Sequence, residues 1–388
     1  MTACITGWAH TRFGRLDGED SESLIVRVVR EAIADANLEA EAIDAIYLGT
    51  FNAGMSPQEF PGALVLQADD ALRFKPVTRV ENACATGSAA IYQGLNAIKS
   101  GSARHVLCVG VEKMTACDTA TVGKSLVRAS YVAEEAREGM TFPGIFGKIA
   151  QGYFQRYGDQ SDALAMIAAK NHKNGSVNPL AHVQKDLGYE FCRNPSDKNP
   201  FVAPPLKRTD CSMISDGAAA LVLSVPDASK NAKKAVMLRT TMQVNDFLPI
   251  SRRDIISFEG PKVAWARALE DAKLGLDDLS FVETHDCFTI AELIEYEAMG
   301  LTEAGQGARA VQEGWTQKDG KLPVNPSGGL KAKGHPVGAT GVSMHVMAAM
   351  QLTGEAGGCQ VDGAELGGVF NMGGAAVANY VSILEPLR

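Results

Sequence analysis

The residue whose type and setting most suggest chemistry is Cys84, which lies in the segment VENACATGSAA (Val80–Ala90). The sequence predicts a strand over Pro76–Val80 and a helix from about Ala85 to Lys99, so Cys84 lies at a helix N-terminus. Unpaired amides and the dipole at such an end stabilise a thiolate and lower its pKa from a reference value near ~8.5. Small residues on both sides of Gly87 would let a bulky substrate approach the backbone. The alternative is a buried structural cysteine, the commoner role of this residue type.

A second candidate is the segment HDCF, which begins at His285 and directly follows an apolar predicted strand. Ligands of parallel α/β sheets bind outside the carboxyl ends of the strands, where both Cys84 and this segment would lie. We therefore expect His285 and Cys287 to border the same cavity as Cys84. Asp286 has a structural alternative, because it could be the N-cap of the helix predicted to follow.

The third candidate is His335, in the segment NPSGGLKAKGHPVGATG. Glycine and proline hold this stretch as an irregular loop before a helix, a setting that favours a catalytic or ligand-binding histidine over a core one. We interpret Lys331 and Lys333 as a solvated face. Metal ligation by His285, Cys287 and His335 matches no common zinc spacing, so no metal site is expected.

The elements that would position these residues follow a strand, helix, strand pattern. Such a pattern predicts an α/β fold in which helices cover a largely parallel sheet. The predicted elements outside the candidate segments are a strand over Ala3–Gly7, a helix over Ser23–Asn37, and strands over Ala45–Leu48 and His105–Val111.

Two pairs of segments indicate that this pattern occurs twice. Ala34–Thr50 (ADANLEAEAIDAIYLGT) resembles Glu270–Asp286 (EDAKLGLDDLSFVETHD), and each runs from a helix end through an acidic turn into an apolar strand. Cys84–Gly87 (CATG) resembles Gly338–Gly341 (GATG), and each opens a long helix that a strand follows. Both matches fall in the same order, which predicts two copies of one βαβαβ unit and therefore a pseudo-dimer.

The stretch between the copies is too long for a loop. We divide the chain into an N-terminal half (1–114 and 209–233), an inserted loop domain (115–208) and a C-terminal half (234–388). Helical spacing at Gly144–Tyr157 and Ser161–Asn174 predicts a partly helical insertion with an irregular tail. Long insertions in compact α/β proteins are often lids or binding loops.

Composition excludes several classes of function. The 388 residues carry a net charge of -8, which argues against a nucleic-acid-binding surface. The eight cysteines show neither CxxC nor zinc-type spacing, as expected of a protein in the reducing cytoplasm. The N-terminus has no secretory pattern, and no run of about 18 apolar residues occurs, so we expect neither secretion by that route nor a membrane span.

Four segments together resemble the thiolase superfamily: ENACATGSAA, DCSMISDGAAALVL, HDCFTIAELIEYEAMGL and NPSGGLKAKGHPVGATG. The HDCF motif resembles that of the sterol-carrier-protein-type thiolases. The resemblance covers nearly the whole chain and implies the αβαβα thiolase fold with two duplicated halves. It also implies an inserted loop domain that contacts coenzyme A, and assembly as homodimers or homotetramers.

The resemblance implies roles for individual residues. Cys84 matches the acylated nucleophile, His335 the histidine that takes its proton, and Cys287 the acid and base at the second substrate's α-carbon. His285 matches the position where common thiolases carry an asparagine that holds an oxyanion-hole water. The amide of Cys84 would form a second oxyanion hole with an amide from the segment Gly367–Ala375, where Asn371 and Gly373 are both candidates. That segment lacks the cysteine of common thiolases, which leaves Cys287 as the second cysteine.

The function implied is a coenzyme-A-dependent acyltransferase that forms or cleaves 3-oxoacyl-CoA through acyl-Cys84. Acyl-CoA and coenzyme A would be substrates, with no permanently bound cofactor, and Lys207 and Arg208 lie in a plausible stretch for the 3'-phosphate. One alternative is a ketosynthase-like decarboxylating enzyme, because Cys84, His285 and His335 also form a Cys-His-His set. Another is a subunit that works only with a small zinc-ribbon and OB-fold partner.

Overall fold

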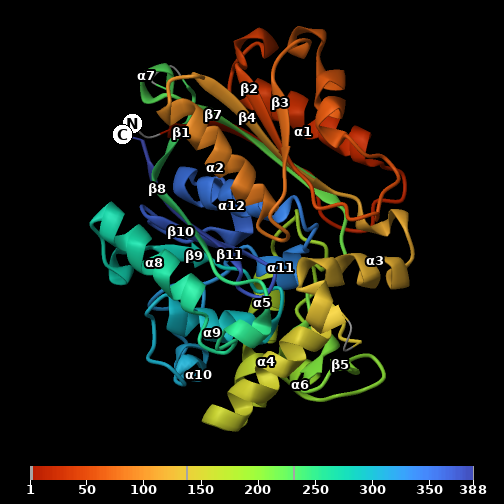
Figure 1. The fold of residues 1–388 in the computed structure, drawn as a ribbon. Coiled ribbons are helices and arrows are strands. Elements are labelled where there is room, and N and C mark those ends of the chain that lie inside the picture. Colours follow the sequence, from red (N-terminus) through yellow and green to blue (C-terminus); the bar gives the residue numbers. More distant parts are fainter. Residues whose placement is uncertain (1–2, 137–138, 230–231, 388) are drawn as a thin grey trace.

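The computed structural model describes residues 3–136, 139–229 and 232–387, whose strands form a nine-stranded mixed sheet and a two-stranded hairpin (Figure 1). Strand β1 lies at the centre of the large sheet and pairs with β8. In spatial order the strands of this sheet are β3 (Val77–Val80), β2 (Ala45–Gly49), β4 (His105–Glu112), β7 (Gly217–Ser224), β1 (Ala3–His10), β8 (Val236–Asn245), β11 (Ala378–Pro386), β10 (Gly367–Gly373) and β9 (Phe281–Glu283).

Strand order and direction show the duplication predicted from the sequence. On one side of the β1–β8 pair, β1 and β7 are antiparallel, β7 and β4 are antiparallel, and β4 and β2 are parallel. On the other side, β8, β11, β10 and β9 repeat those three relations in the same order. Even the parallel pairing of β2 with β3 has a counterpart, a parallel bridge between Val282 and Val324. The two halves of the chain therefore share one topology.

Helices complete the layers of an αβαβα fold. Helix α1 (Ser21–Asp35) covers the outer face of β1, β4 and β7, and α8 (Glu259–Ala272) covers β8 and β11. Between the two halves lie α2 (Thr86–Lys99) and α12 (Thr340–Thr353), and α12 contacts strands of both halves (Figure 1). A helix in such a place must be apolar on every side, and nearly all of α12 is buried.

The two central helices cross at glycines. A Cβ atom built at Gly87 of α2 would lie 2.6 Å from the amide nitrogen of Val342, and one at Gly341 of α12 would lie 2.2 Å from that of Ser88. No side chain fits at either distance, so this close crossing requires both glycines. Gly87 and Gly341 occupy the same position in the CATG and GATG motifs, each at the start of its helix.

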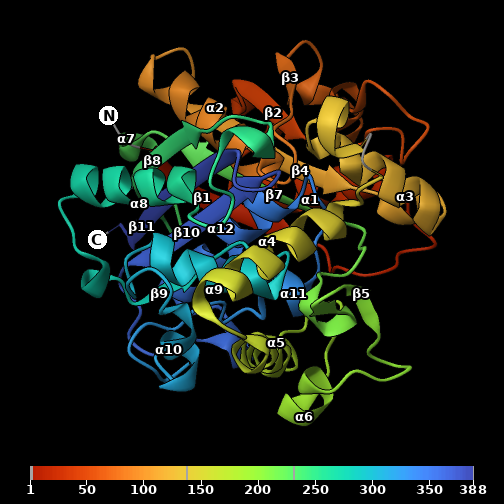
Figure 2. The same cartoon turned by 60° about the horizontal axis from the view of Figure 1, so that its bottom comes forward.

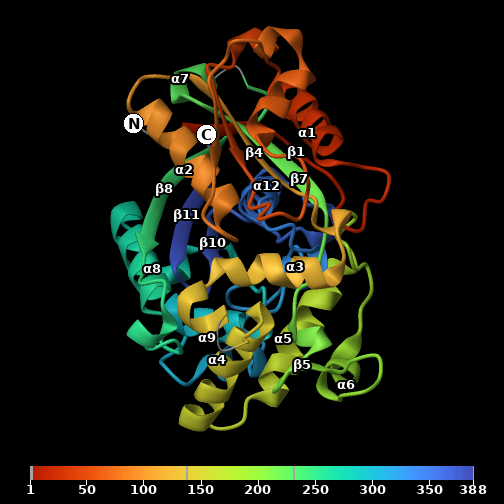
Figure 3. The same ribbon diagram turned by 45° about the vertical axis from the view of Figure 1, so that its right-hand side comes forward.

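Residues 115–208 contain the expected helices, with slightly different ends. The two long helices are α4 (Phe142–Tyr157) and α5 (Ser161–Gly175). The same stretch also contains the shorter helices α3 (Thr119–Leu126) and α6 (Gly188–Arg193), and a hairpin of β5 (Phe201–Ala203) and β6 (Leu206–Lys207). Helix α5 packs against α9 (Thr289–Ala298) and α11 (Gly329–Lys333), which adjoin the two histidine motifs (Figures 2 and 3). The remaining short helices are α7 (Pro226–Ser229) and α10 (Gly307–Gln312). Throughout these described ranges, no helix has the length and hydropathy that crossing a bilayer requires.

Candidate active site

Cys84 lies in a tight turn between β3 and α2. Ala83, the residue before it, adopts a left-handed backbone conformation with φ of 50°, which is strained for a residue with a Cβ. The Thr86 hydroxyl accepts the backbone N–H of Asn82 at 2.8 Å and closes the turn. Cys84 itself is only 2% exposed. The turn therefore fixes the cysteine at the start of α2, as the sequence predicts.

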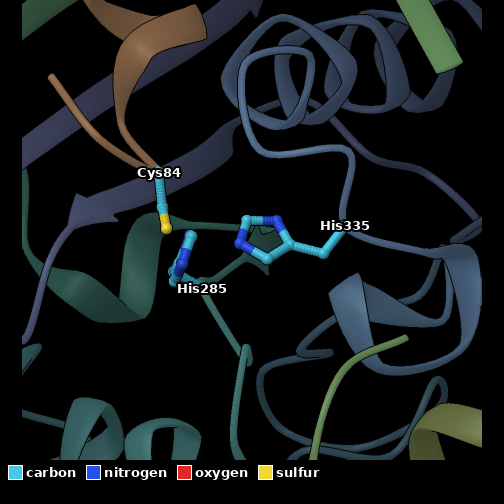
Figure 4. Close-up of side chains that lie close together, drawn as sticks. All are labelled: Cys84, His285 and His335. Atoms are coloured by element: carbon cyan, nitrogen blue, oxygen red, sulfur yellow. The ribbon is translucent and has the colours of Figure 1, made fainter. Parts of the chain in front are cut away.

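Three of the predicted site residues converge on one point. The sulfur of Cys84 and one ring nitrogen each of His285 and His335 all lie within 4.8 Å of one another (Figure 4). The two imidazole centroids are 5.1 Å apart and their planes are nearly perpendicular, at 85°. His285 lies in the chain just after β9, and His335 lies in the loop that joins α11 to α12. Residues about 50 to 250 positions apart in the sequence thus surround one thiol.

The protonation of His335 follows from its partner. Its Nδ1 lies 2.7 Å from the hydroxyl oxygen of Thr340, and that hydroxyl donates its only proton to the carbonyl of Pro336 at 3.0 Å. His335 Nδ1 must therefore be the donor, which leaves a lone pair on Nε2. This Nε2 is buried, has no hydrogen-bond partner in the part of the chain that the structure describes, and faces Cys84 and His285 (Figure 4). His335 thus presents a proton acceptor to the thiol.

His285 has the opposite arrangement, because of Asn371. The Asn371 side-chain nitrogen lies 3.1 Å from the carbonyl oxygen of Cys84, an atom that can only accept, so this nitrogen is the amide donor. It also lies 2.9 Å from His285 Nδ1, which therefore accepts. The proton of a neutral His285 then lies on Nε2, which is buried and has no partner among the described residues. His285 thus presents an N–H donor beside the acceptor of His335.

Burial keeps both histidines neutral. It lowers the pKa of His335 to about 3, assisted by the nearby Lys333 ammonium, and lowers the pKa of His285 well below its usual range, assisted by His335. Neutral imidazoles are the forms that the hydrogen-bond assignment requires.

The thiol of Cys84 corrects one expectation. A helix N-terminus predicts a lowered pKa, but burial raises the pKa of Cys84 to about 12, and the charges of Glu112 and Glu81 act in the same direction. Backbone N–H groups of Gly374 and of Cys84 itself oppose this rise without overcoming it. Desolvation therefore outweighs the helix end, and the resting residue is a neutral thiol that needs a base.

The backbone N–H of Gly374, which lowers the pKa of Cys84, is not one of the amides named from the sequence. Asn371 and Gly373 are the sequence candidates for the amide facing Cys84, but the N–H that acts on its sulfur belongs to Gly374. Gly374 has φ of 63°, a left-handed conformation that turns the chain just after β10. Asn371 contributes its side chain, as described above. Consecutive glycines give no means of choosing between their amides from sequence.

Cys287 is buried beside this group, at 2% exposure. Burial raises the pKa of its thiol well above the ordinary value, and the charge of a Cys84 thiolate raises it further. Its carbonyl accepts the N–H of Ser212 at 2.8 Å, which connects the HDCF segment to the chain just after the insertion. A negative charge on Cys84 would thus act on Cys287, which indicates that the two thiols lie near each other.

Two other sequence interpretations are wrong. Asp286 is not the N-cap of α9, because its carboxylate accepts the backbone N–H groups of Leu330 at 2.6 Å and Lys331 at 3.2 Å, at the start of α11. Lys331 and Lys333 do not form a solvated face, because they are 2% and 0% exposed. The ammonium of Lys331 donates to the carbonyl of Cys211, and that of Lys333 donates to the hydroxyl of Ser343.

The two residues expected to contact coenzyme A, Lys207 and Arg208, differ in exposure. Lys207 is 3% exposed and pairs with Asp210 at 3.0 Å, so its charge is already compensated inside the protein. Arg208 is exposed, and its role stays a prediction.

Among the described residues, the side chains close enough together to hold a metal ion are Cys84, His285 and His335. Cys287, which the sequence analysis considered with the two histidines, is not in this group. A metal needs a lone pair from every ligand, and the bond from Asn371 leaves His285 with an N–H at Nε2. This tautomer does not suit a metal ligand.

Two family models cover most of the chain. The one described as "Thiolase, N-terminal domain" matches residues 3–187, and "Thiolase C-terminal domain-like" matches residues 243–386. An acetyl-CoA acetyltransferase of Methanothermobacter thermautotrophicus is 39% identical over 385 residues, which span 98% of each chain. Sterol carrier protein 2 of Oryctolagus cuniculus is 31% identical over 405 residues, which span 98% of this chain and 72% of that protein.

A solved structure agrees in fold. The structure of an "Ltp2-ChsH2(DUF35) aldolase" matches with a TM-score of 0.86 and 21% identity, over 99% of this chain and 98% of that one. At this identity the likeness concerns the fold alone. The family models, the relatives that match nearly all of this chain and the duplicated sheet agree with the resemblance found in the four sequence motifs, including that of HDCF to the sterol-carrier-protein type. The chain therefore belongs to the thiolase family.

Proposed function

We propose that this protein is a coenzyme-A-dependent acyltransferase that cleaves or forms 3-oxoacyl-CoA by a reversible Claisen reaction through acyl-Cys84. The observation that carries the proposal is the pairing of a proton acceptor, His335 Nε2, with a donor, His285 Nε2–H, around one buried neutral thiol. Such a thiol is a poor nucleophile until a base takes its proton. Membership of the thiolase family and the similarity to an acetyl-CoA acetyltransferase support this chemistry.

In the cleavage direction, Cys84 Sγ attacks the 3-oxo carbon while its proton passes to His335 Nε2. The N–H groups of Cys84 and Gly374 stabilise the tetrahedral oxyanion, a contribution of about 3–4 kcal/mol per donor in comparable sites. The bond between the α-carbon and the 3-oxo carbon then breaks. The departing carbanion takes the proton of Cys287, and His285 Nε2–H stabilises the charge that develops on its thioester oxygen. One acyl-CoA leaves, and acyl-Cys84 remains.

Coenzyme A then completes the turnover. Its thiol gives a proton to the Cys287 thiolate, and its sulfur attacks the carbonyl of acyl-Cys84. As the Cys84 sulfur departs, it recovers its proton from His335, so both cysteines and both histidines return to their starting states. The condensation direction reverses each step, with Cys287 as the base that removes the α-proton.

Covalent labelling tests the proposal. Incubation with acetyl-CoA should add one acetyl group to Cys84, detected by intact mass and peptide mapping, and Cys84→Ala should abolish the label. Acetyl-CoA is the first substrate to test because of the acetyl-CoA acetyltransferase relative. Acylation at Cys287 in place of Cys84 would contradict the assignment.

Dependence on a partner is a separate question, which the matching aldolase structure raises because its name joins two proteins, Ltp2 and ChsH2. If the isolated chain exchanges its acyl group but turns over slowly, addition of a small zinc-ribbon and OB-fold protein should restore turnover. Full turnover by the isolated chain would exclude such a requirement.

A further inference from the structure

Asn371 is a fully buried amide that joins three functional groups of the site. It lies on β10 with 0% exposure, and its oxygen accepts the hydroxyl proton of Ser88 at 2.8 Å. Its nitrogen donates to the carbonyl of Cys84 at 3.1 Å and to His285 Nδ1 at 2.9 Å. The three hydrogen bonds therefore fit a single orientation of the Asn371 amide, and both of its side-chain N–H groups have an acceptor.

We propose that Asn371 is a positioning residue that selects the Nε2–H tautomer of His285 and fixes this imidazole to the backbone of the nucleophile. This inference rests on the proposed function, because it concerns the donor that acts during carbon–carbon bond cleavage. The contact matters because a neutral imidazole carries one proton and has two places for it. Without a donor at Nδ1, the proton could lie on either nitrogen.

The cost of the wrong tautomer follows from what faces His285. His335 Nε2 already carries a lone pair beside the Cys84 thiol, because Thr340 holds its proton on Nδ1. If His285 Nε2 also carried a lone pair, two acceptors would face one substrate and no side-chain N–H of this pair would meet the thioester oxygen. Asn371 thus divides the two histidines into one acceptor and one donor.

A second consequence concerns geometry. The same amide nitrogen holds the carbonyl of Cys84 and the ring of His285, so the nucleophile and the donor share one anchor across the two halves of the chain. Ser88, on α2, sets the rotation of that anchor. A shift of β10 relative to α2 would therefore disturb the hydrogen bonds to the nucleophile and to the donor at the same time.

Nitrogen NMR gives a readout that needs no substrate. In protein labelled with 15N-histidine, His285 should show a protonated Nε2 and a bare Nδ1, with its signals assigned by their loss in His285→Gln. Asn371→Leu preserves approximate volume and removes the donor, so a signal of protonated Nδ1 should appear. A protonated Nδ1 in the wild-type protein would overturn the proposal, whatever reaction the enzyme catalyses.

Kinetics separate the two half-reactions. In Asn371→Leu, deuterium exchange at the α-carbon of acetyl-CoA should fall by more than acylation does, by up to about 10²-fold if the wrong tautomer removes the oxyanion donor completely. Acylation of Cys84 should fall only about fivefold, since it loses one ordinary hydrogen bond to the Cys84 carbonyl. Equal losses in both half-reactions would indicate a merely structural role and refute the inference.

A matched control comes from another buried histidine. His345 Nε2 lies 2.8 Å from the hydroxyl of Ser382, within α12 and β11. Ser382→Ala removes a buried hydrogen bond to a histidine without touching Cys84, His285 or Asn371. It should keep both half-reactions near wild-type rates, and a loss of exchange as large as that of Asn371→Leu would overturn the specific role of Asn371.

Discussion

Thr340→Val tests the assignment of His335 as the base that activates Cys84. The substitution keeps the shape of the side chain and removes the hydroxyl that accepts His335 Nδ1–H at 2.7 Å. Thr340 is fully buried, so water does not replace the lost partner. A buried donor left without a partner costs about 1–3 kcal/mol. Part of that cost is relieved if the proton moves to Nε2, where it blocks the lone pair that the thiol needs.

The expected loss in rate follows from the same figure. At about 1.4 kcal/mol per factor of ten, acylation of Cys84 should slow by about 5- to 150-fold. Rapid mixing with acetyl-CoA, acid quench and intact-mass analysis measures this single turnover directly. The matched control is Thr340→Ser, which retains the hydroxyl and should lose less than about fivefold. If Thr340→Val acylates at the wild-type rate while folded, or if Thr340→Ser is equally slow, the assignment of the His335 tautomer is wrong.

The remaining predictions concern the second cysteine, the thiol's ionisation and assembly. Cys287→Ala should still acylate Cys84 but should lose about 10²- to 10⁴-fold in acetyl-CoA condensation and in α-proton exchange. Near-normal condensation would contradict the role of Cys287. Activity with malonyl-CoA alone would favour a ketosynthase. Burial raises the pKa of Cys84 to about 12, so the rate at which iodoacetamide alkylates this residue should rise about tenfold per pH unit from pH 7 to 10. A rate that is already constant near pH 7 would show that the resting residue is a thiolate. Sedimentation should show a homo-oligomer at micromolar concentration, because β3 leaves a partly exposed edge strand, and a 41.1 kDa monomer would contradict this.

Local patterns predicted the large elements and the candidate residues that the structure brings together, because both depend on short segments. Cys84, His285 and His335 stood beside predicted strand ends or helix starts, and the topology of a duplicated α/β sheet brings such places together. The repeated CATG and GATG motifs predicted the symmetry of the sheet for the same reason. Periodicity likewise gave α4 and α5 to within two residues at each end.

Burial could not be predicted at this level. Lysines in a glycine-rich loop are normally exposed, but Lys331 and Lys333 lie under residues from distant parts of the chain, including Cys211. For the same reason the predicted direction of the Cys84 pKa shift was wrong, since the sequence shows the helix start but not the residues that bury the thiol. The bond of Asp286 to α11 also depends on a contact about 45 residues away, which competes with local capping.

The crossing of α2 and α12 bears on how the chain arose. Gly87 and Gly341 occupy one position in two copies of one motif, and each lies against the backbone of the other helix. In an ancestor made of two identical subunits, one codon would have supplied both glycines across a twofold axis. After such a fusion each codon could mutate alone, so the two helix starts could diverge, and they now carry Cys84 in one copy and Gly338 in the other. The crossing itself allowed no such freedom, because replacing either glycine alone would press a Cβ atom against the backbone of the other helix.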